Sequence, residues 1–271
     1  MKNLFDIKGK VIVVTGAGGV LAGVTARYLA SCGAKIAYLD RDDTQEANIK
    51  AFSEENGYEH IFCKCNVLER ESLENAKAEV LAKFGTYDIL INGAGGNMAG
   101  ATISPDKTFF DLDMSAWEKV LKLNLEGSIL PILVFAKHFE ETKKGIILNF
   151  SSMTAQQTVT RVFGYSNAKA GIDNMTKFLA VEFAKKIGDG VRVNAIAPGF
   201  FISEQNRALL TNPDGSYTER GNQVISKTPF GRFGIAEEVF GTIHYLCSDA
   251  SAFVTGTVVP VDGGFSCFSG V

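Results

Sequence analysis

Ser152, Tyr165 and Lys169 follow one another at intervals of 13 and 4 residues, directly after an apolar run at 145–150. If that run is a buried strand and Tyr165 opens a helix, Lys169 lies one turn beyond Tyr165 on the same helix face. A tyrosine pKa is ordinarily about 10, and a neighbouring ammonium favours the phenolate and lowers that pKa. Tyr165 would then exchange protons with a substrate oxygen that Ser152 holds by a hydrogen bond. The spacing therefore predicts redox chemistry.

A tyrosine and a lysine four residues apart have a simpler interpretation. On most helices such a pair is a half-buried aromatic ring beside a solvated lysine. The serine at the required interval and the elements around these residues favour the catalytic interpretation.

Short apolar runs alternate with segments of helical periodicity along the whole chain. The predicted strands are 11–15, 34–40, 60–65, 87–92, 145–150, 191–197 and 257–261, and the predicted helices are 20–32, 43–56, 69–84, 115–139, 164–187 and 236–248. Strands that are continuously apolar are typical of a parallel sheet covered by helices on both faces. We expect an α/β fold with a doubly wound, parallel, seven-stranded Rossmann sheet, as a single domain over residues 1–271.

Two long segments interrupt this alternation, at 98–113 and 200–234. Each follows the carboxyl end of a predicted strand, which is where open α/β sheets bind ligands. We expect these segments to shape a substrate pocket, with 200–234 as a lid insertion. A solvent-facing insertion is the alternative.

A glycine-rich turn joins the first strand to the first helix, with Gly16, Gly18 and Gly19 followed by Val20 and Leu21. Glycines let the backbone approach a pyrophosphate, which the helix N-terminus then binds through its free N–H groups. Asp40 ends the second strand, where a carboxylate accepts hydrogen bonds from ribose hydroxyls and repels a 2′-phosphate. The pattern favours NAD over NADP, although Arg41 could host a phosphate.

Composition and charge limit the binding partners and the cellular location that we expect for the protein. The 271 residues carry a net charge of −3 and no basic patch, which argues against nucleic acid. No apolar segment approaches the roughly 20 residues of a membrane span, and the charges of residues 1–10 are followed by no apolar stretch of signal-peptide length, so we expect no signal peptide. The five cysteines include no Cys-x-x-Cys pair, so we expect reduced thiols and no metal site. We expect a cytoplasmic protein that binds no membrane.

Together these residues resemble the short-chain dehydrogenase/reductase family, and the likeness covers nearly the whole chain. Residues 15–22 resemble its Thr-Gly-x-x-x-Gly-x-Gly loop, 92–95 its Asn-Asn-Ala-Gly motif, 192–199 its sixth-strand motif and 261–264 its C-terminal ending. The resemblance implies a catalytic set of Asn124, Ser152, Tyr165 and Lys169. Lys169 would also contact the nicotinamide ribose, and Asn124 would hold a water that links Lys169 to solvent.

The same resemblance implies the residues that contact the cofactor. They are Gly16, Gly18, Gly19, Val20, Leu21, Asp40, Asn66, Val67, Asn92, Ala94, Gly95, Tyr165, Lys169, Pro198, Gly199, Phe201 and Ser203.

The chain departs from the family pattern at a few positions. Val20 and Ala22 replace two loop glycines, and Gly93 replaces the second asparagine of Asn-Asn-Ala-Gly. Asn66 stands where the family usually has an aspartate that contacts adenine. Gly16, Gly18 and Gly19 must therefore carry the geometry of the turn.

A narrower likeness is to family members that act on hexonates, namely D-mannonate oxidoreductases and gluconate 5-dehydrogenases. Their substrates carry one carboxylate, for which a fixed cation is the natural partner. Arg207 in the lid is the candidate ligand, although a surface arginine is an equal alternative. Asn97 and Arg161 are further candidates, and Ser152 and Tyr165 would contact the reacting oxygen.

The same residues are compatible with other functions. The same catalytic set could serve another sugar or polyol, or a carrier-bound 3-ketoacyl group. A catalytically silent nucleotide sensor is the alternative outside enzymology. Family resemblance also implies a homotetramer.

Overall fold

The computed structural model describes residues 2–270 and, within them, every side chain except those of residues 204 and 205. Its centre is one parallel sheet with the strand order β3-β2-β1-β4-β5-β6-β7. The strands are β1 Val11–Thr15, β2 Lys35–Asp40, β3 His60–Lys64, β4 Ile89–Asn92, β5 Gly145–Phe150, β6 Val191–Pro198 and β7 Val258–Val261. The predicted seven-stranded, doubly wound sheet is confirmed, with strand boundaries within two residues of those expected.

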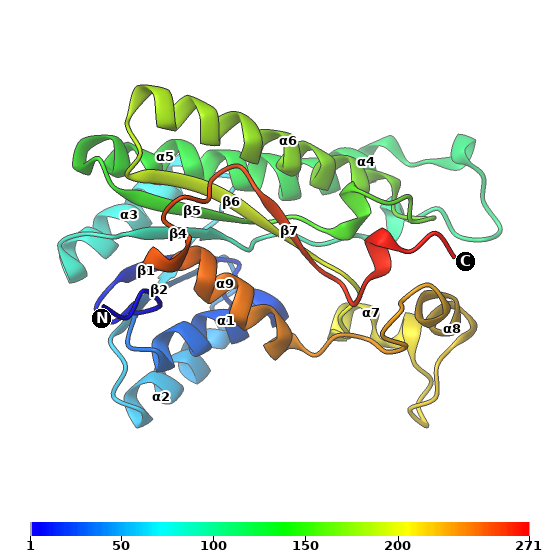
Figure 1. Cartoon of the computed structure of the whole chain (residues 1–271). Helices are drawn as coiled ribbons and strands as arrows, with labels where there is room; N and C mark the ends of the chain where they lie inside the picture. The colour runs from blue at the N-terminus through cyan, green and yellow to red at the C-terminus, as the bar shows by residue number, and fades with distance from the viewer. Residues whose placement is uncertain (1, 271) are drawn as a thin grey trace.

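Helices cover both faces of the sheet (Figure 1). One layer contains α1 Val20–Ser31, α2 Glu46–Glu55 and α9 Phe240–Cys247, and the other contains α3 Arg70–Phe84, α4 Met114–Leu121, α5 Gly127–Thr142 and α6 Phe163–Lys186. Side chains alternate between the faces of each strand, so the two layers bury two separate cores. This double coverage explains why the central strands are apolar at nearly every position.

The helix expected at 115–139 is present and unbroken over residues 114–142. It consists of α4 and α5 with a π-helical turn at Lys122–Glu126 between them, which was not predicted. Such turns insert an extra residue into the helix and often occur at functional sites. Here the turn carries Asn124, whose side chain is fully buried.

The lid segment, residues 200–234, contains two helices that were not among the predicted ones. They are α7 Glu204–Leu210 and α8 Glu219–Ser226. A small core of Leu210, Val224 and Phe233 holds them together. In Figure 1 the lid segment extends beyond the carboxyl edge of the sheet.

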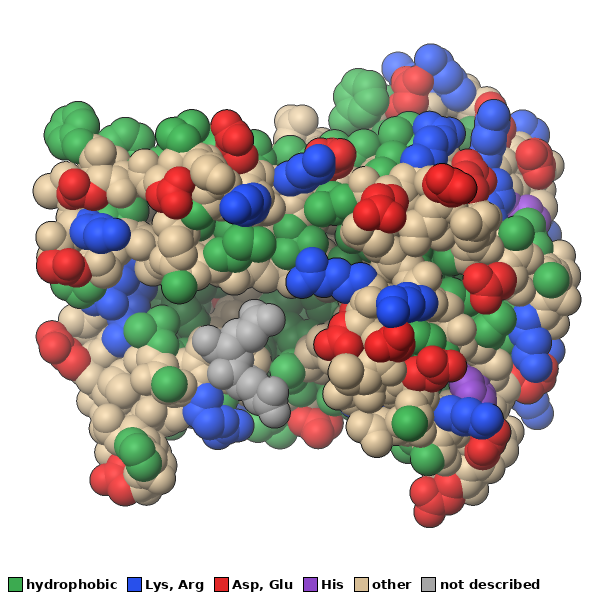
Figure 2. All heavy atoms as spheres, turned by 180° about the vertical axis from the view of Figure 1, so that it is seen from behind, with side chains coloured by type: hydrophobic (Ala, Val, Ile, Leu, Met, Phe, Trp, Pro, Cys, Tyr) green, Lys and Arg blue, Asp and Glu red, His purple; other side chains and the backbone are tan. Residues whose placement is uncertain are grey.

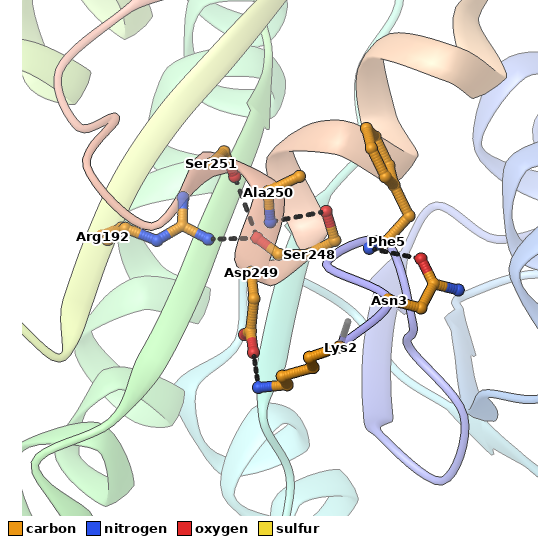
Figure 3. Close-up of polar contacts among 8 residues, drawn as sticks. All are labelled: Lys2, Asn3, Phe5, Arg192, Ser248, Asp249, Ala250 and Ser251. Carbon is orange, nitrogen blue, oxygen red and sulfur yellow. Dashed lines mark hydrogen bonds and ion pairs between the residues drawn. The ribbon is translucent and has the colours of Figure 1, made fainter.

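Arg192 anchors the C-terminal part of the chain to β6. Its guanidinium is buried and donates hydrogen bonds to the carbonyls of Leu246, Ser248 and Val254 at 3.1–3.2 Å. Figure 3 shows the one to Ser248. Burial lowers the pKa of this arginine. The arginine of the sixth-strand motif therefore serves structure, because it satisfies carbonyls at the end of α9 that the helix leaves without partners.

Every helix within the described residues is too short or too polar to cross a membrane.

Candidate active site

The chemistry-bearing residues meet at the carboxyl edge of the sheet. Gly16 follows β1, Asp40 ends β2, Asn92 ends β4, Ser152 follows β5 and Pro198 ends β6. Because all strands are parallel, residues far apart in the sequence come together at this one edge. This is the edge at which doubly wound sheets bind ligands.

Lys169, a member of the predicted catalytic group, is buried and held in place by a hydrogen bond. It lies in α6 with only 4% of its surface exposed, and its Nζ donates a 2.8 Å hydrogen bond to the carbonyl of Phe150 at the end of β5. The same Nζ lies 5.3 Å from the centre of the Tyr165 ring. Ser152, also buried, follows Phe150 by two residues and begins a 3-10 turn. The structure thus brings the predicted serine, tyrosine and lysine together.

In the free protein the net shift of the Tyr165 pKa is upward, opposite to the lowering expected from the Lys169 charge, because burial dominates it. Burial raises the pKa of Tyr165 above its usual 10.0, and the neighbouring Ser152 hydroxyl opposes this only in part. Burial also lowers the pKa of Lys169 to about 8, with Asp173 opposing it. Loss of water disfavours both charged forms, and the cation lies against the face of the ring. At neutral pH the resting pair is therefore a neutral phenol beside an ammonium.

Asn124 positions the backbone beside Lys169. Its amide donates to the carbonyls of Gly96 (2.7 Å) and Val120 (2.8 Å), and its oxygen accepts from the Gly96 N–H (3.1 Å). A Cβ on Gly95 would lie 2.6 Å from that oxygen and 3.5 Å from Nζ of Lys169. These contacts of the Asn124 side chain hold the turn after β4 close to Lys169.

The glycine turn forms a cradle at the N-terminus of α1. Gly16 has a φ of +65°, and a Cβ there would lie 2.6 Å from Cα of Ala94. Gly19 caps the helix without a side-chain hydrogen bond, and no acidic residue occupies the first turn of α1. The first N–H groups of a helix have no partner within it, so they are available to a phosphate. The cradle fits a dinucleotide pyrophosphate.

Asp40 lies beside this cradle. Its Oδ2 accepts a 2.8 Å hydrogen bond from the Gly18 N–H, and its Oδ1 accepts one of 3.0 Å from the Asp42 N–H. The carboxylate is thus fixed next to the turn by the backbone. Each oxygen retains a free lone pair that can accept from a ribose hydroxyl.

Three other predicted cofactor residues use their side chains within the protein. Asn66 donates to Glu69 and accepts from the Leu68 N–H, Val67 packs in the core, and Asn92 donates to Asn149 on the adjacent strand. The side-chain oxygen of Asn92 is buried and accepts no hydrogen bond from the described residues, and Asn66 keeps a lone pair on its side-chain oxygen. These two oxygens and the backbone groups of the three residues remain available to a cofactor.

The predicted residues of the lid and the nearby loop are placed as follows. Phe201 is buried against Gly234, and the N–H of Ser203 donates to Asn206 at the start of α7. Asn97 donates to Thr102 within its own loop. Arg207 lies on α7 with an exposed side chain. None of these contacts by itself indicates a substrate carboxylate ligand.

Sequence reasoning missed residues whose partners lie far away in the chain. The Ser151 hydroxyl donates a short hydrogen bond to Asp173, one helical turn after Lys169, and burial raises the pKa of that carboxyl. Arg220 of α8 donates to Thr160, 60 positions earlier, in the loop before α6. No local spacing could have connected these pairs.

Comparisons with known proteins agree with this geometry. A family model described as Enoyl-(Acyl carrier protein) reductase matches residues 16–266. An uncharacterised oxidoreductase of Haemophilus influenzae is 44% identical, over 98% of this chain and 96% of the relative.

Solved structures show the same arrangement. A Haemophilus influenzae protein provisionally described as a D-mannonate oxidoreductase, with bound NAD, superposes with a TM-score of 0.91 at 44% identity, covering 98% of each chain. A gluconate 5-dehydrogenase of Burkholderia cenocepacia, in complex with NADP and tartrate, superposes with a TM-score of 0.86 at 28% identity, again covering 98% of each chain. The chain therefore belongs to the short-chain dehydrogenase/reductase family of oxidoreductases that act on CH–OH groups.

Proposed function

We propose that this protein is an NAD-dependent oxidoreductase that interconverts a hydroxyl and a ketone of a hexonate, with D-mannonate and D-fructuronate as the leading pair. The observation that carries the reaction type is the buried Ser152, Tyr165 and Lys169 group at the sheet edge, beside a glycine cradle. The substrate class is supported by the similarity to the NAD-bound Haemophilus influenzae protein. We also propose that the chain forms a single domain in which the lid segment covers the substrate.

Each catalytic side chain has one task in this proposal. Tyr165 donates its phenolic proton to the carbonyl oxygen in reduction and removes the hydroxyl proton in oxidation. Ser152 donates a hydrogen bond to the same oxygen and holds it beside the phenol. Lys169, fixed by the carbonyl of Phe150, favours the phenolate in the oxidation direction once the site is occupied. Bound NAD supplies the hydride acceptor or donor.

The preference for NAD rests on Asp40. The carboxylate is held at the edge of the cradle by two backbone N–H groups. A 2′-phosphate at this position would meet a fixed negative charge, whereas ribose hydroxyls would donate to it. The related gluconate 5-dehydrogenase binds NADP, so both cofactors belong in any assay.

A gluconate 5-dehydrogenase, or another sugar or polyol dehydrogenase, is the second candidate. It is favoured by the similarity to the Burkholderia cenocepacia enzyme. We further propose a cytoplasmic homotetramer. Exposed apolar side chains on α5 and α6, Leu133, Phe178 and Val181 among them, support burial of this face against other copies.

A substrate panel tests the proposal. Purified protein is assayed with hexonates, hexuronates, and matched uncharged polyols and ketoses, each with NAD(H) and NADP(H). We expect the highest kcat/KM for D-fructuronate or D-mannonate with NAD(H). Tyr165→Phe should abolish turnover while NAD(H) binding persists, because only the phenolic hydroxyl is removed. Full turnover by that variant would exclude the proton-transfer role, and a strong preference for uncharged polyols would exclude the hexonate assignment.

A further inference from the structure

Two arginines come together between the lid segment and the loop before α6. Arg220 of α8 donates from Nη1 to the Thr160 hydroxyl at 3.2 Å and from Nη2 to the Thr160 carbonyl at 3.5 Å. Arg161 is the next residue in the loop, and both arginine side chains are half-buried. Thr160 therefore holds one guanidinium beside the other.

The two positive charges oppose each other. Burial lowers the pKa of Arg220, and the charge of Arg161 lowers it further. Among the side chains that the structure describes, no carboxylate lies within 4.0 Å of either guanidinium. Two positive charges in a partly desolvated site repel each other, and an anion bound between them offsets this repulsion.

The backbone at Arg161 adds a second, independent sign of a functional site. Its φ is +78°, in the left-handed region that favours glycine. Its carbonyl accepts a 3.0 Å hydrogen bond from the Ile103 N–H, which ties the 98–113 segment to this loop. This conformation is uncommon for a residue other than glycine, and such residues cluster at functional sites.

The loop that carries Arg161 leads into α6, the helix that carries Tyr165. Arg161 precedes Tyr165 by four positions, and Tyr165 packs against Ala101, Ala116 and Val120, next to the loop that Arg161 holds. Figure 2 shows a hollow in the middle of this face of the molecule, with basic and acidic side chains around its edges.

We propose that Arg161 and Arg220 together bind the carboxylate of the substrate, with Thr160 as the residue that positions Arg220. This inference rests on the proposed hexonate function and replaces Arg207 as the carboxylate ligand. A guanidinium matches a carboxylate through two parallel N–H donors, and two guanidiniums supply enough donors for all four of its lone-pair positions. Binding of the anion would relieve the repulsion between them.

Two variants test the pair without disturbing the fold. Arg220→Gln removes the charge and keeps a polar side chain, and Arg161→Gly removes the side chain where glycine suits the backbone. For the hexonate, we expect each variant to raise KM about 10- to 100-fold, the usual worth of a charge-assisted hydrogen bond, with kcat changed far less. For the matched polyol, which has CH₂OH in place of the carboxylate, KM should not change. Arg70→Gln, on α3 at an exposed position, is the matched control.

A binding measurement separates this inference from the proposed function. Tartrate or malonate should raise the melting temperature of the wild-type protein with NAD, and Arg220→Gln and Arg161→Gly should remove that increase. If no hexonate is turned over but the anion effect still depends on Arg220, the hexonate function fails and the anion site stands. If hexonates are turned over with an unchanged KM in both variants, or if Arg207→Gln alone raises KM, the assignment to Arg161 and Arg220 is overturned.

Discussion

At the scale of single residues, Tyr165 and Lys169, the proposed catalytic pair, show how burial and charge compete. Burial raises the pKa of Tyr165 and lowers the pKa of Lys169 to about 8, so each loses charge relative to water. The Tyr-x-x-x-Lys spacing predicted their proximity correctly because it depends only on helix geometry. It could not predict the direction of the tyrosine pKa, which depends on how completely the folded protein excludes water from the site.

This competition predicts a pH dependence that differs between the two directions of the reaction. Below pH about 8 Lys169 is charged and favours the phenolate that oxidation requires, and above it the lysine loses its proton. Oxidation by wild type should therefore exceed that by Lys169→Met most strongly below pH 8, and the ratio should fall as the pH rises through that value. Carbonyl reduction needs the neutral phenol, so it should vary little across neutral pH. The measurement is kcat/KM from pH 6 to 10 in both directions.

The control for this prediction is the affinity of Lys169→Met for NAD(H), determined at each pH. Loss of a cofactor contact would weaken binding equally across the range and would leave the oxidation ratio constant. A ratio that is independent of pH would contradict the assigned role of the lysine charge.

At the scale of elements, two departures from the family motifs, Ala22 and Gly93, lie against each other. A Cβ on Gly93 would lie 2.6 Å from Cβ of Ala22 in α1 and 2.8 Å from the carbonyl of Thr15. The Ala22 side chain thus fills the space that a side chain at position 93 would need. Gly23 lets α1 approach the Ala17 carbonyl, because a Cβ on Gly23 would lie 2.7 Å from that oxygen. The departures therefore change the packing partners and keep the glycine turn, as the positive φ of Gly16 shows.

We expect Ala22 and Gly93 to be energetically coupled. Gly93→Ala should destabilise the protein by about 1–3 kcal/mol through overpacking, and Ala22→Gly by about 0.5–1 kcal/mol through the helix preference for alanine. The double variant should be destabilised by less than the sum, because one of the two close contacts disappears. Urea unfolding of the four proteins gives the coupling free energy. Strict additivity would mean that the two positions are independent.

Elements also differ in how well the sequence predicts them. The strands were predicted within two residues because double coverage makes each one a continuous apolar run with polar or glycine boundaries. The π-helical turn between α4 and α5 was not predicted, because its residue Asn124 bonds to Gly96, almost thirty residues earlier in the chain. The lid helices α7 and α8 have only 7 and 8 residues, too few for a clear periodicity. The sequence indicated Arg161 as a candidate, but the proposed pairing with Arg220 depends on the contact between α8 and the loop before α6, which only the folded chain shows.

At the scale of the whole molecule, the helix layer of α5 and α6 exposes large apolar side chains. Phe178 is 64% exposed and Val181 56% exposed on α6, and Leu133 is 55% exposed on α5. Both helices pack on the same core layer of the sheet, and Figure 1 shows them on the same side of it. Single exposed apolar residues are common, but several on adjoining helices favour an interface.

Phe178→Glu should therefore dissociate the proposed homotetramer. A fully buried phenylalanine contributes about 1.5–3 kcal/mol relative to an exposed one, and a buried unpaired carboxylate costs more, so every copy of the interface would be weakened. Light scattering coupled to size exclusion should give a tetramer for wild type and a smaller species for the variant at the same micromolar concentration. Phe110→Glu, at a side chain that is 94% exposed in the 98–113 segment outside α5 and α6, is the matched control and should leave the mass unchanged. A monomeric wild-type protein, or a variant of undiminished mass, would show that this apolar face is not where the copies meet.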